Sequence, residues 1–170
     1  MMGKGRIHIY YGNGKGKTTA AVGQALRMAG AGKKVMMIQF LKDGFSSENM
    51  MLEKCGIKVI AQKMPEMFID MSDSKMIKEV SLMVNQLFEK IDNSYDGIIL
   101  DELLDAISLS LINEQLVYDR LVSLKDNHEV ILTGRMPSNK LKVIFDYSSE
   151  IKKHKHPYDK GIMARKGIEY

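Results

Sequence analysis

The chain has 170 residues, of which 45% are hydrophobic and 27% charged, so we expect one globular domain over residues 1–170. Its one cysteine cannot form an internal disulfide, and nothing in the sequence requires an oxidising compartment. No run of about 18 apolar residues is present, and the N-terminus lacks the apolar stretch of a signal peptide. We therefore expect no membrane span and a cytoplasmic location.

Charge is unevenly distributed along the chain, although the net value is only +4. The first 42 residues hold eight basic side chains and no acidic one, whereas residues 43–151 carry a net charge of −8. A basic, acid-free opening suits a polyanionic ligand, although most charged runs are simply solvated surface. Basic residues are not interleaved with aromatic ones and tryptophan is absent, so we expect no nucleic-acid partner.

Short apolar runs alternate along the chain with amphipathic segments. The apolar runs predict strands at 7–11, 35–41, 58–61, 97–100, 129–133 and 147–151. Helical spacing predicts helices at 18–30, 47–54, 73–91, 102–111, 113–124 and 138–145, and residues 62–71 fit neither pattern. Candidate N-caps are Ser46 or Ser47, Asn113 and Ser138. This alternation predicts an α/β fold with a mostly parallel sheet covered by helices on both faces.

A glycine-rich loop joins the first predicted strand to the first predicted helix. Glycines let backbone N–H groups turn toward an anion, and the start of the helix adds partial positive charge. Lys17 is then the cation expected to reach phosphate oxygens, and the Thr18 hydroxyl is a candidate Mg²⁺ ligand. The alternative is a turn without a ligand, and Tyr11 stands where the usual motif has its first glycine. The residues expected to cradle phosphate are Gly12, Asn13, Gly14, Lys15, Gly16, Lys17, Thr18 and Thr19.

Two carboxylates, Asp101 and Glu102, directly follow the strand predicted at 97–100. An acid at the carboxyl end of a parallel strand, near a phosphate loop, is placed to hold a metal ion. The same pattern by itself is also typical of a surface turn. Arg135 follows the strand predicted at 129–133, so it is expected at the same edge, either binding phosphate or lying free on the surface.

Taken together, these motifs resemble those of the ATP:corrinoid adenosyltransferase family. The resemblance covers nearly the whole chain in the right order, and its most specific part is the C-terminal tail, which general ATPases lack. The matching segments are 12–21 (GNGKGKTTAA), 39–42 (QFLK), 100–102 (LDE), 133–135 (TGR), 155–161 (KHPYDKG) and 164–170 (ARKGIEY).

The resemblance implies a P-loop nucleotide-binding fold of the RecA-like type and usually a homodimer. It implies transfer of the 5′-deoxyadenosyl group of ATP to the Co(I) of a corrinoid, with release of triphosphate, in adenosylcobalamin biosynthesis or corrinoid salvage. Because Co(I) is itself the nucleophile, no activated serine or cysteine is needed. Mg²⁺ is the expected metal cofactor, and a reduced flavoprotein or another electron donor is the expected redox partner.

Residue roles also follow from the resemblance. Loop residues 13–19 would bind the phosphates and Mg²⁺, while Arg27 and Arg135 match arginines that contact phosphate. Glu102, with or without Asp101, matches the acid on the metal side. The implied catalytic residues are Lys17, Thr18 and Glu102, and the implied metal ligands are Thr18, Asp101 and Glu102.

On the corrinoid side, the chain departs from better-known members of the family. Those members carry an N-terminal extension before the loop, and a Phe and a Trp that face the lower side of the cobalt. Here ten residues precede Tyr11, and Trp is absent. Within residues 64–71, Phe68 is the candidate for the lower-face position.

Two other functions stay open at this point. A P-loop ATPase or kinase would use Glu102 as a general base and release phosphate without a corrinoid. A non-catalytic partner would bind ATP and leave it unchanged. Cys55 is expected to be a small buried residue rather than a nucleophile.

Overall fold

The computed structural model describes residues 5–42, 46–63 and 71–169, and these ranges contain one six-stranded sheet. The strand order is β3-β2-β4-β5-β1-β6, and every neighbouring pair is parallel. The strands are β1 (Ile7–Tyr11), β2 (Val35–Gln39), β3 (Lys58–Ala61), β4 (Gly97–Asp101), β5 (Glu129–Gly134) and β6 (Tyr147–Glu150).

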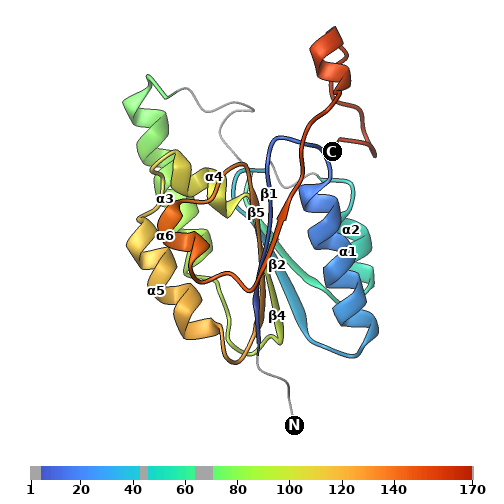
Figure 1. Cartoon of the computed structure of the whole chain (residues 1–170), viewed down its shortest axis with the longest axis vertical. Helices are drawn as coiled ribbons and strands as arrows, with labels where there is room; N and C mark the ends of the chain where they lie inside the picture. Colours follow the sequence, from blue (N-terminus) through green and yellow to red (C-terminus); the bar gives the residue numbers. More distant parts are fainter. Residues whose placement is uncertain (1–4, 43–45, 64–70, 170) are drawn as a thin grey trace.

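Helices cover both faces of this sheet, as Figure 1 shows. Two of them lie on one face, α1 (Lys17–Gly30) and α2 (Asn49–Lys54). The other face carries α3 (Ser74–Phe88), α4 (Leu103–Ser108), α5 (Glu114–Leu124) and α6 (Asn139–Lys142). The predicted α/β architecture is confirmed, and within the described ranges the sheet is parallel throughout.

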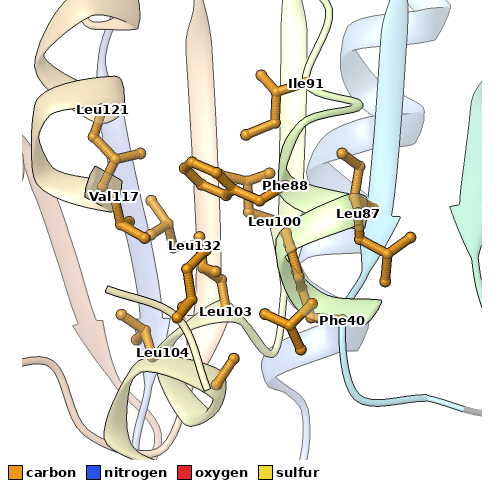
Figure 2. Close-up of a cluster of buried hydrophobic side chains, with 14 of the residues drawn as sticks. Phe40, Leu87, Phe88, Ile91, Leu100, Leu103, Leu104, Val117, Leu121 and Leu132 are labelled. Atoms are coloured by element: carbon orange, nitrogen blue, oxygen red, sulfur yellow. The ribbon is translucent and has the colours of Figure 1, made fainter. Parts of the chain in front are cut away.

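The sheet divides the core into two apolar layers, because successive residues of a strand point to opposite faces. In β4, Ile98 and Leu100 belong to the layer under α3, α4 and α5, whereas Ile99 belongs to the layer under α1. Figure 2 shows the larger layer, where Leu100 and Leu132 from the sheet gather with Phe88 of α3. All three β4 residues are fully buried, which explains why a parallel strand reads as one continuous apolar run.

Each predicted strand and helix is present, and only the ends differ. β2 ends at Gln39 rather than at residue 41, and α3 ends at Phe88 rather than at residue 91. Ile91 is nevertheless buried, because the apolar spacing continues into the turn that follows the helix. The pattern of buried residues therefore outlasts the hydrogen-bonded helix, and this is why sequence patterns overestimate helix length.

The predicted caps divide into two confirmed and one wrong. The side chain of Asn113 accepts hydrogen bonds from two N–H groups of α5, and that of Ser138 accepts one from Leu141. The N-cap of α2 is Glu48 instead of Ser46 or Ser47, and its side chain makes no capping bond.

The prediction that Cys55 is buried is also wrong. Cys55 is exposed because it stands at the C-cap of the short helix α2, on the outer layer of the fold. The residue type alone does not show on which face of an element a single cysteine lies, so the prediction from composition was wrong.

Three chain segments meet at the carboxyl edge of the sheet. β5 lies between β1 and β4, so the loop after β1 and the acids at the end of β4 are separated by one strand. The C-terminal segment, red in Figure 1, runs past the same edge near the N-terminal end of α1. In the described part of the chain, no helix is both long and apolar enough to cross a membrane.

Candidate active site

The glycine-rich loop after β1 is fixed by backbone hydrogen bonds to two other loops. The Gly12 N–H donates to the carbonyl of Arg135 at 2.9 Å, and the Gly14 N–H donates to that of Ile151 at 2.8 Å. A Cβ on Gly12 would lie 2.4 Å from the Ile151 carbonyl oxygen, and its φ of 118° is one that glycine adopts readily. The loop therefore needs glycine here to pass close to the segment after β6.

Helix α1 begins directly after this loop, at Lys17, and presents its open N-terminus to the edge of the sheet. Its N-cap, Gly16, offers no side-chain bond, and the first turn holds no acid, so its N–H groups are suited to an anion. Lys17 Nζ donates to the Gly14 carbonyl at 2.9 Å, which folds the ammonium back over the loop. Burial lowers the pKa of Lys17, although attraction from Asp105 opposes that shift.

Asp101 is the centre of a buried polar cluster. It is fully buried, and its Oδ1 accepts hydrogen bonds from Thr18 Oγ1 at 3.0 Å and from Thr133 Oγ1 at 2.6 Å. Its Oδ2 forms an ion pair with Lys42 Nζ at 2.8 Å. The structure thus joins the first helix to the acid at the end of β4, across the intervening strand β5.

Glu102 differs from its neighbour in both conformation and ionisation. Its φ of 64° is left-handed, a strained conformation for a side chain of this size, and its N–H donates to Thr133 Oγ1 at 2.9 Å. Burial and the nearby charge of Asp101 raise the pKa of Glu102 to about 7, although Lys42 opposes the shift. Glu102 therefore lies at the rim of the cluster, and a cation bound nearby would lower its raised pKa and favour the ionised carboxylate.

Two cavities flank the loop. One, of about 500 Å³, is lined by the start of α1, by Lys42, Glu48 and Glu102, and by tail residues 167–169. The other, of about 430 Å³, lies against Asn13, Lys17, Arg135 and tail residues that include Tyr158. Volumes of this size are typical of small-ligand sites. Lys15 and Lys17 line both cavities, so the two spaces meet along the loop.

Most of the predicted loop residues face these cavities. Lys15, Gly16, Lys17, Thr18 and Thr19 line the first, while Asn13 and Gly14 line the second. The Asn13 side chain also accepts a hydrogen bond from the Lys153 N–H at 2.9 Å, which fixes the tail to the loop.

The two predicted arginines differ in position. The side chain of Arg135 is 84% exposed beside the loop, with Nε 3.9 Å from Asp105 Oδ1, and it lines the second cavity. Arg27 is exposed in the last turn of α1, about 15 Å along the helix axis from Lys17. Within one described copy of the chain, Arg27 is therefore not brought to the loop. Phe68 lies outside the described residues.

Sequence reasoning left two residues of the cluster without a role, Lys42 and Thr133. Both stand in segments that carry the family resemblance, and each follows or ends an apolar strand. Their partner is Asp101, and that partnership depends on the strand order β2-β4-β5. The sequence feature that could have identified Lys42 and Thr133 is a polar residue at the end of an apolar strand. That feature does not show which strands are neighbours in the sheet.

Oxygen donors at this edge fit a Mg²⁺ ion. Thr18 Oγ1, Asp101 and Glu102 offer a hydroxyl and two carboxylates, which are hard ligands of the kind Mg²⁺ takes together with phosphate oxygens. The described ranges contain no group of three His, Cys, Asp or Glu side chains that could hold a metal by themselves, so a site here depends on the Thr18 hydroxyl as well as on the acids. The candidate metal site is therefore the one built on Thr18 and the acids.

Taken together, the parallel sheet, the strand–loop–helix with Lys17 and Thr18, and the acid at a separated strand define a P-loop nucleotide-binding protein of the RecA-like class. A family model described as ATP:corrinoid adenosyltransferase BtuR/CobO/CobP matches residues 3–170. The chain belongs to this ATP:corrinoid adenosyltransferase family.

Curated relatives agree with this membership. The corrinoid adenosyltransferase of Escherichia coli is 34% identical over 173 residues, covering 98% of this chain and 86% of the relative. Corrinoid adenosyltransferase CobA of Salmonella typhimurium is 32% identical over 171 residues, with the same two coverages. Among solved structures, the flagellar accessory protein FlaH of Methanocaldococcus jannaschii aligns with a TM-score of 0.52 at 20% identity, over 84% of this chain and 67% of FlaH, and this likeness concerns the fold alone.

Proposed function

We propose that this protein transfers the 5′-deoxyadenosyl group of ATP to the Co(I) of a corrinoid and releases triphosphate. The observation that carries the proposal is the family match, which extends over residues 3–170. The site supports it, because a phosphate loop, a helix N-terminus and Lys17 converge on one edge of the sheet. Family membership favours this reaction over the ATPase or kinase alternative based on Glu102.

The proposed reaction needs charge neutralisation more than proton transfer. The electron pair of Co(I) forms a bond to the ribose C5′ while the C5′–O bond breaks, and that bonding pair leaves with the triphosphate. No protein nucleophile is consumed. Lys17, Arg135 and the N–H groups at the start of α1 would bind the phosphate chain and stabilise the charge that develops on its leaving oxygen.

Mg²⁺ would be held by the Thr18 hydroxyl and by Asp101, with Glu102 at the rim. When bound, the ion supplies further positive charge to the triphosphate. Thr133 would keep Asp101 oriented, since its hydroxyl donates to Oδ1 at 2.6 Å. These assignments treat Lys17, Thr18 and Glu102 as the catalytic group, as expected from the sequence.

The remaining partners are inferred from the same family. We expect a reduced flavoprotein or another electron donor to generate Co(I), a homodimer as the active form, and a cytoplasmic location. Phe68 stays the candidate for the lower face of the corrinoid. The two described cavities beside the loop, of about 500 and 430 Å³, have the volume of small-ligand sites, so we expect the nucleotide inside them and the corrinoid outside them.

An absorbance assay tests the reaction directly. The protein is mixed with Mg-ATP and chemically reduced cobalamin under anaerobic conditions, and the spectrum of the alkylated cobalt is followed while the phosphate products are separated. We expect alkylated corrinoid and triphosphate in equal amounts. Phosphate release that is independent of corrinoid would instead identify a hydrolase or kinase, and unchanged ATP would identify a binding module.

A further inference from the structure

Lys42 reaches the acid of the site from a neighbouring strand. It follows β2, whose last residue, Gln39, pairs in register with Asp101 of β4. The Phe40 N–H donates to the Asp101 carbonyl at 3.1 Å, so the backbone between β2 and Lys42 is held against the acid strand. The lysine side chain is only 18% exposed, and it therefore occupies interior space rather than solvent.

The ammonium of Lys42 lies among three oxygens. Its Nζ is 2.8 Å from Asp101 Oδ2, 3.3 Å from Thr18 Oγ1 and 3.6 Å from Glu48 Oε1. Lys17, at the start of α1, donates from its Nζ to the Gly14 carbonyl and makes no ion pair with Asp101 in the described part of the chain. Among the described residues, Lys42 thus supplies the cation that pairs with Asp101.

Two of these three oxygens are those proposed to hold Mg²⁺. The metal binds oxygen at about 2.0–2.1 Å and tolerates little distortion of its octahedral geometry. An ammonium already in contact with Thr18 Oγ1 and Asp101 both fills part of this space and repels a second cation.

We propose that the Lys42 ammonium occupies the Mg²⁺ position in the nucleotide-free enzyme and excludes free divalent cation from it. This inference rests on the proposed metal site. Nucleotide phosphates give the ammonium a new anionic partner in the cavity that Lys42 lines, so that metal and nucleotide enter together. Binding of the two is then positively coupled, and removal of the lysine charge frees the metal site from its dependence on nucleotide.

Manganese binding without nucleotide tests this inference. Free Mn²⁺ is measured by its electron paramagnetic resonance signal during titration into wild-type protein, Lys42→Met and Lys42→Arg. We expect Lys42→Met to bind one Mn²⁺ at least about tenfold more tightly than wild type, and Lys42→Arg, which keeps the charge, to stay as weak as wild type. Lys125→Met is the matched control, because Lys125 is also paired with an aspartate, Asp146, but lies elsewhere.

Two results of the Mn²⁺ titration would overturn the inference about Lys42. Equal Mn²⁺ affinity in wild type and a folded Lys42→Met variant would overturn the inference, as would tight binding by Lys42→Arg. If circular dichroism shows that Lys42→Met does not fold, Lys42→Gln replaces it, since its amide can still donate to Asp101. Adenosyl transfer by wild type is measured on the same preparation. If wild type is active but binds Mn²⁺ as tightly as Lys42→Met does, this inference alone is contradicted. If Lys42→Met binds Mn²⁺ more tightly but wild type transfers no adenosyl group, the proposed function alone is contradicted.

Discussion

Two charged regions border the same cavity and differ in how their charges are held. Around Asp101, an acid that is fully buried has three partners, two hydroxyls and one ammonium, from three separate parts of the chain. In the tail, the Arg165–Glu169 pair is four residues apart, and the arginine side chain is 55% exposed. Buried charges are strongly coupled to their partners, whereas exposed pairs are screened by water and salt. Substitutions around Asp101 should therefore lower the stability of the fold, whereas substitutions in the tail pair should affect only the binding of a ligand.

Asp101→Ala is expected to have the largest effect, because it breaks the buried cluster itself. Lys42 would keep its charge in a buried position without its closest partner, at a cost of about 3–5 kcal/mol in the free energy of unfolding. Adenosyl transfer should be lost as well. Urea denaturation and the absorbance assay measure the two effects, and Asp126→Ala, an exposed aspartate, is the control. A variant as stable as wild type would show that the cluster does not support the fold.

Lys17→Ala separates catalysis from stability. Because the hydrogen bond that Lys17 Nζ makes among the described residues goes to a carbonyl of its own loop, we expect the free energy of unfolding to change by less than about 1 kcal/mol. The rate of adenosyl transfer should fall by about 10²–10³, since the leaving triphosphate loses a cation. Lys33→Ala, at an exposed position, should leave the rate unchanged. Activity retained in Lys17→Ala would mean that the loop does not hold the phosphate chain.

Glu102→Gln tests the charge at the rim of the cluster through pH. The folded pKa of Glu102 is raised to about 7 from 4.5, so the folded state binds more protons than the unfolded state between these values. Ionisation of Glu102 therefore makes wild type less stable as pH rises from 4.5 to 7, by up to about 3 kcal/mol. The variant carries no such charge, and it should be more stable than wild type at pH 8 but equal to it at pH 4.

Urea denaturation at several pH values measures this difference, with Glu89→Gln, at an exposed glutamate, as the control. A stability difference that does not change with pH would contradict the raised pKa of Glu102.

The same contrast explains what could be predicted from the sequence. Strands such as β4 could be found because both faces are buried and the run is wholly apolar, and the loop could be found because its residues are contiguous. The Asp101 cluster could be found only in part. Thr18 and Asp101 are 83 residues apart, and their contact with Lys42 and Thr133 depends on a strand order that no local pattern encodes.

The position of Arg27 on α1 shows a second limit of prediction from the sequence. Arg27 has the residue type that matches a phosphate contact, but α1 carries it to the far end of the helix from the loop. Matching a family motif shows where a residue stands in the sequence, but it does not show how far that residue lies from the ligand. That distance follows from the rise of the helix, about 1.5 Å per residue, and requires knowing where the helix begins.

Arg165→Ala should give the smallest effect, and it completes the comparison from the tail. The Arg165 side chain pairs with Glu169, and Gly167, Ile168 and Glu169 line the cavity beside Lys17. Since the arginine side chain is largely exposed, the midpoint of urea denaturation should hardly move. Loss of the pair should loosen these three residues and weaken ATP binding by about threefold, measured by calorimetry, with Lys166→Ala as the neighbouring control. A large fall in the denaturation midpoint would instead show that the tail is part of the stable core, and the two regions would then differ only in position.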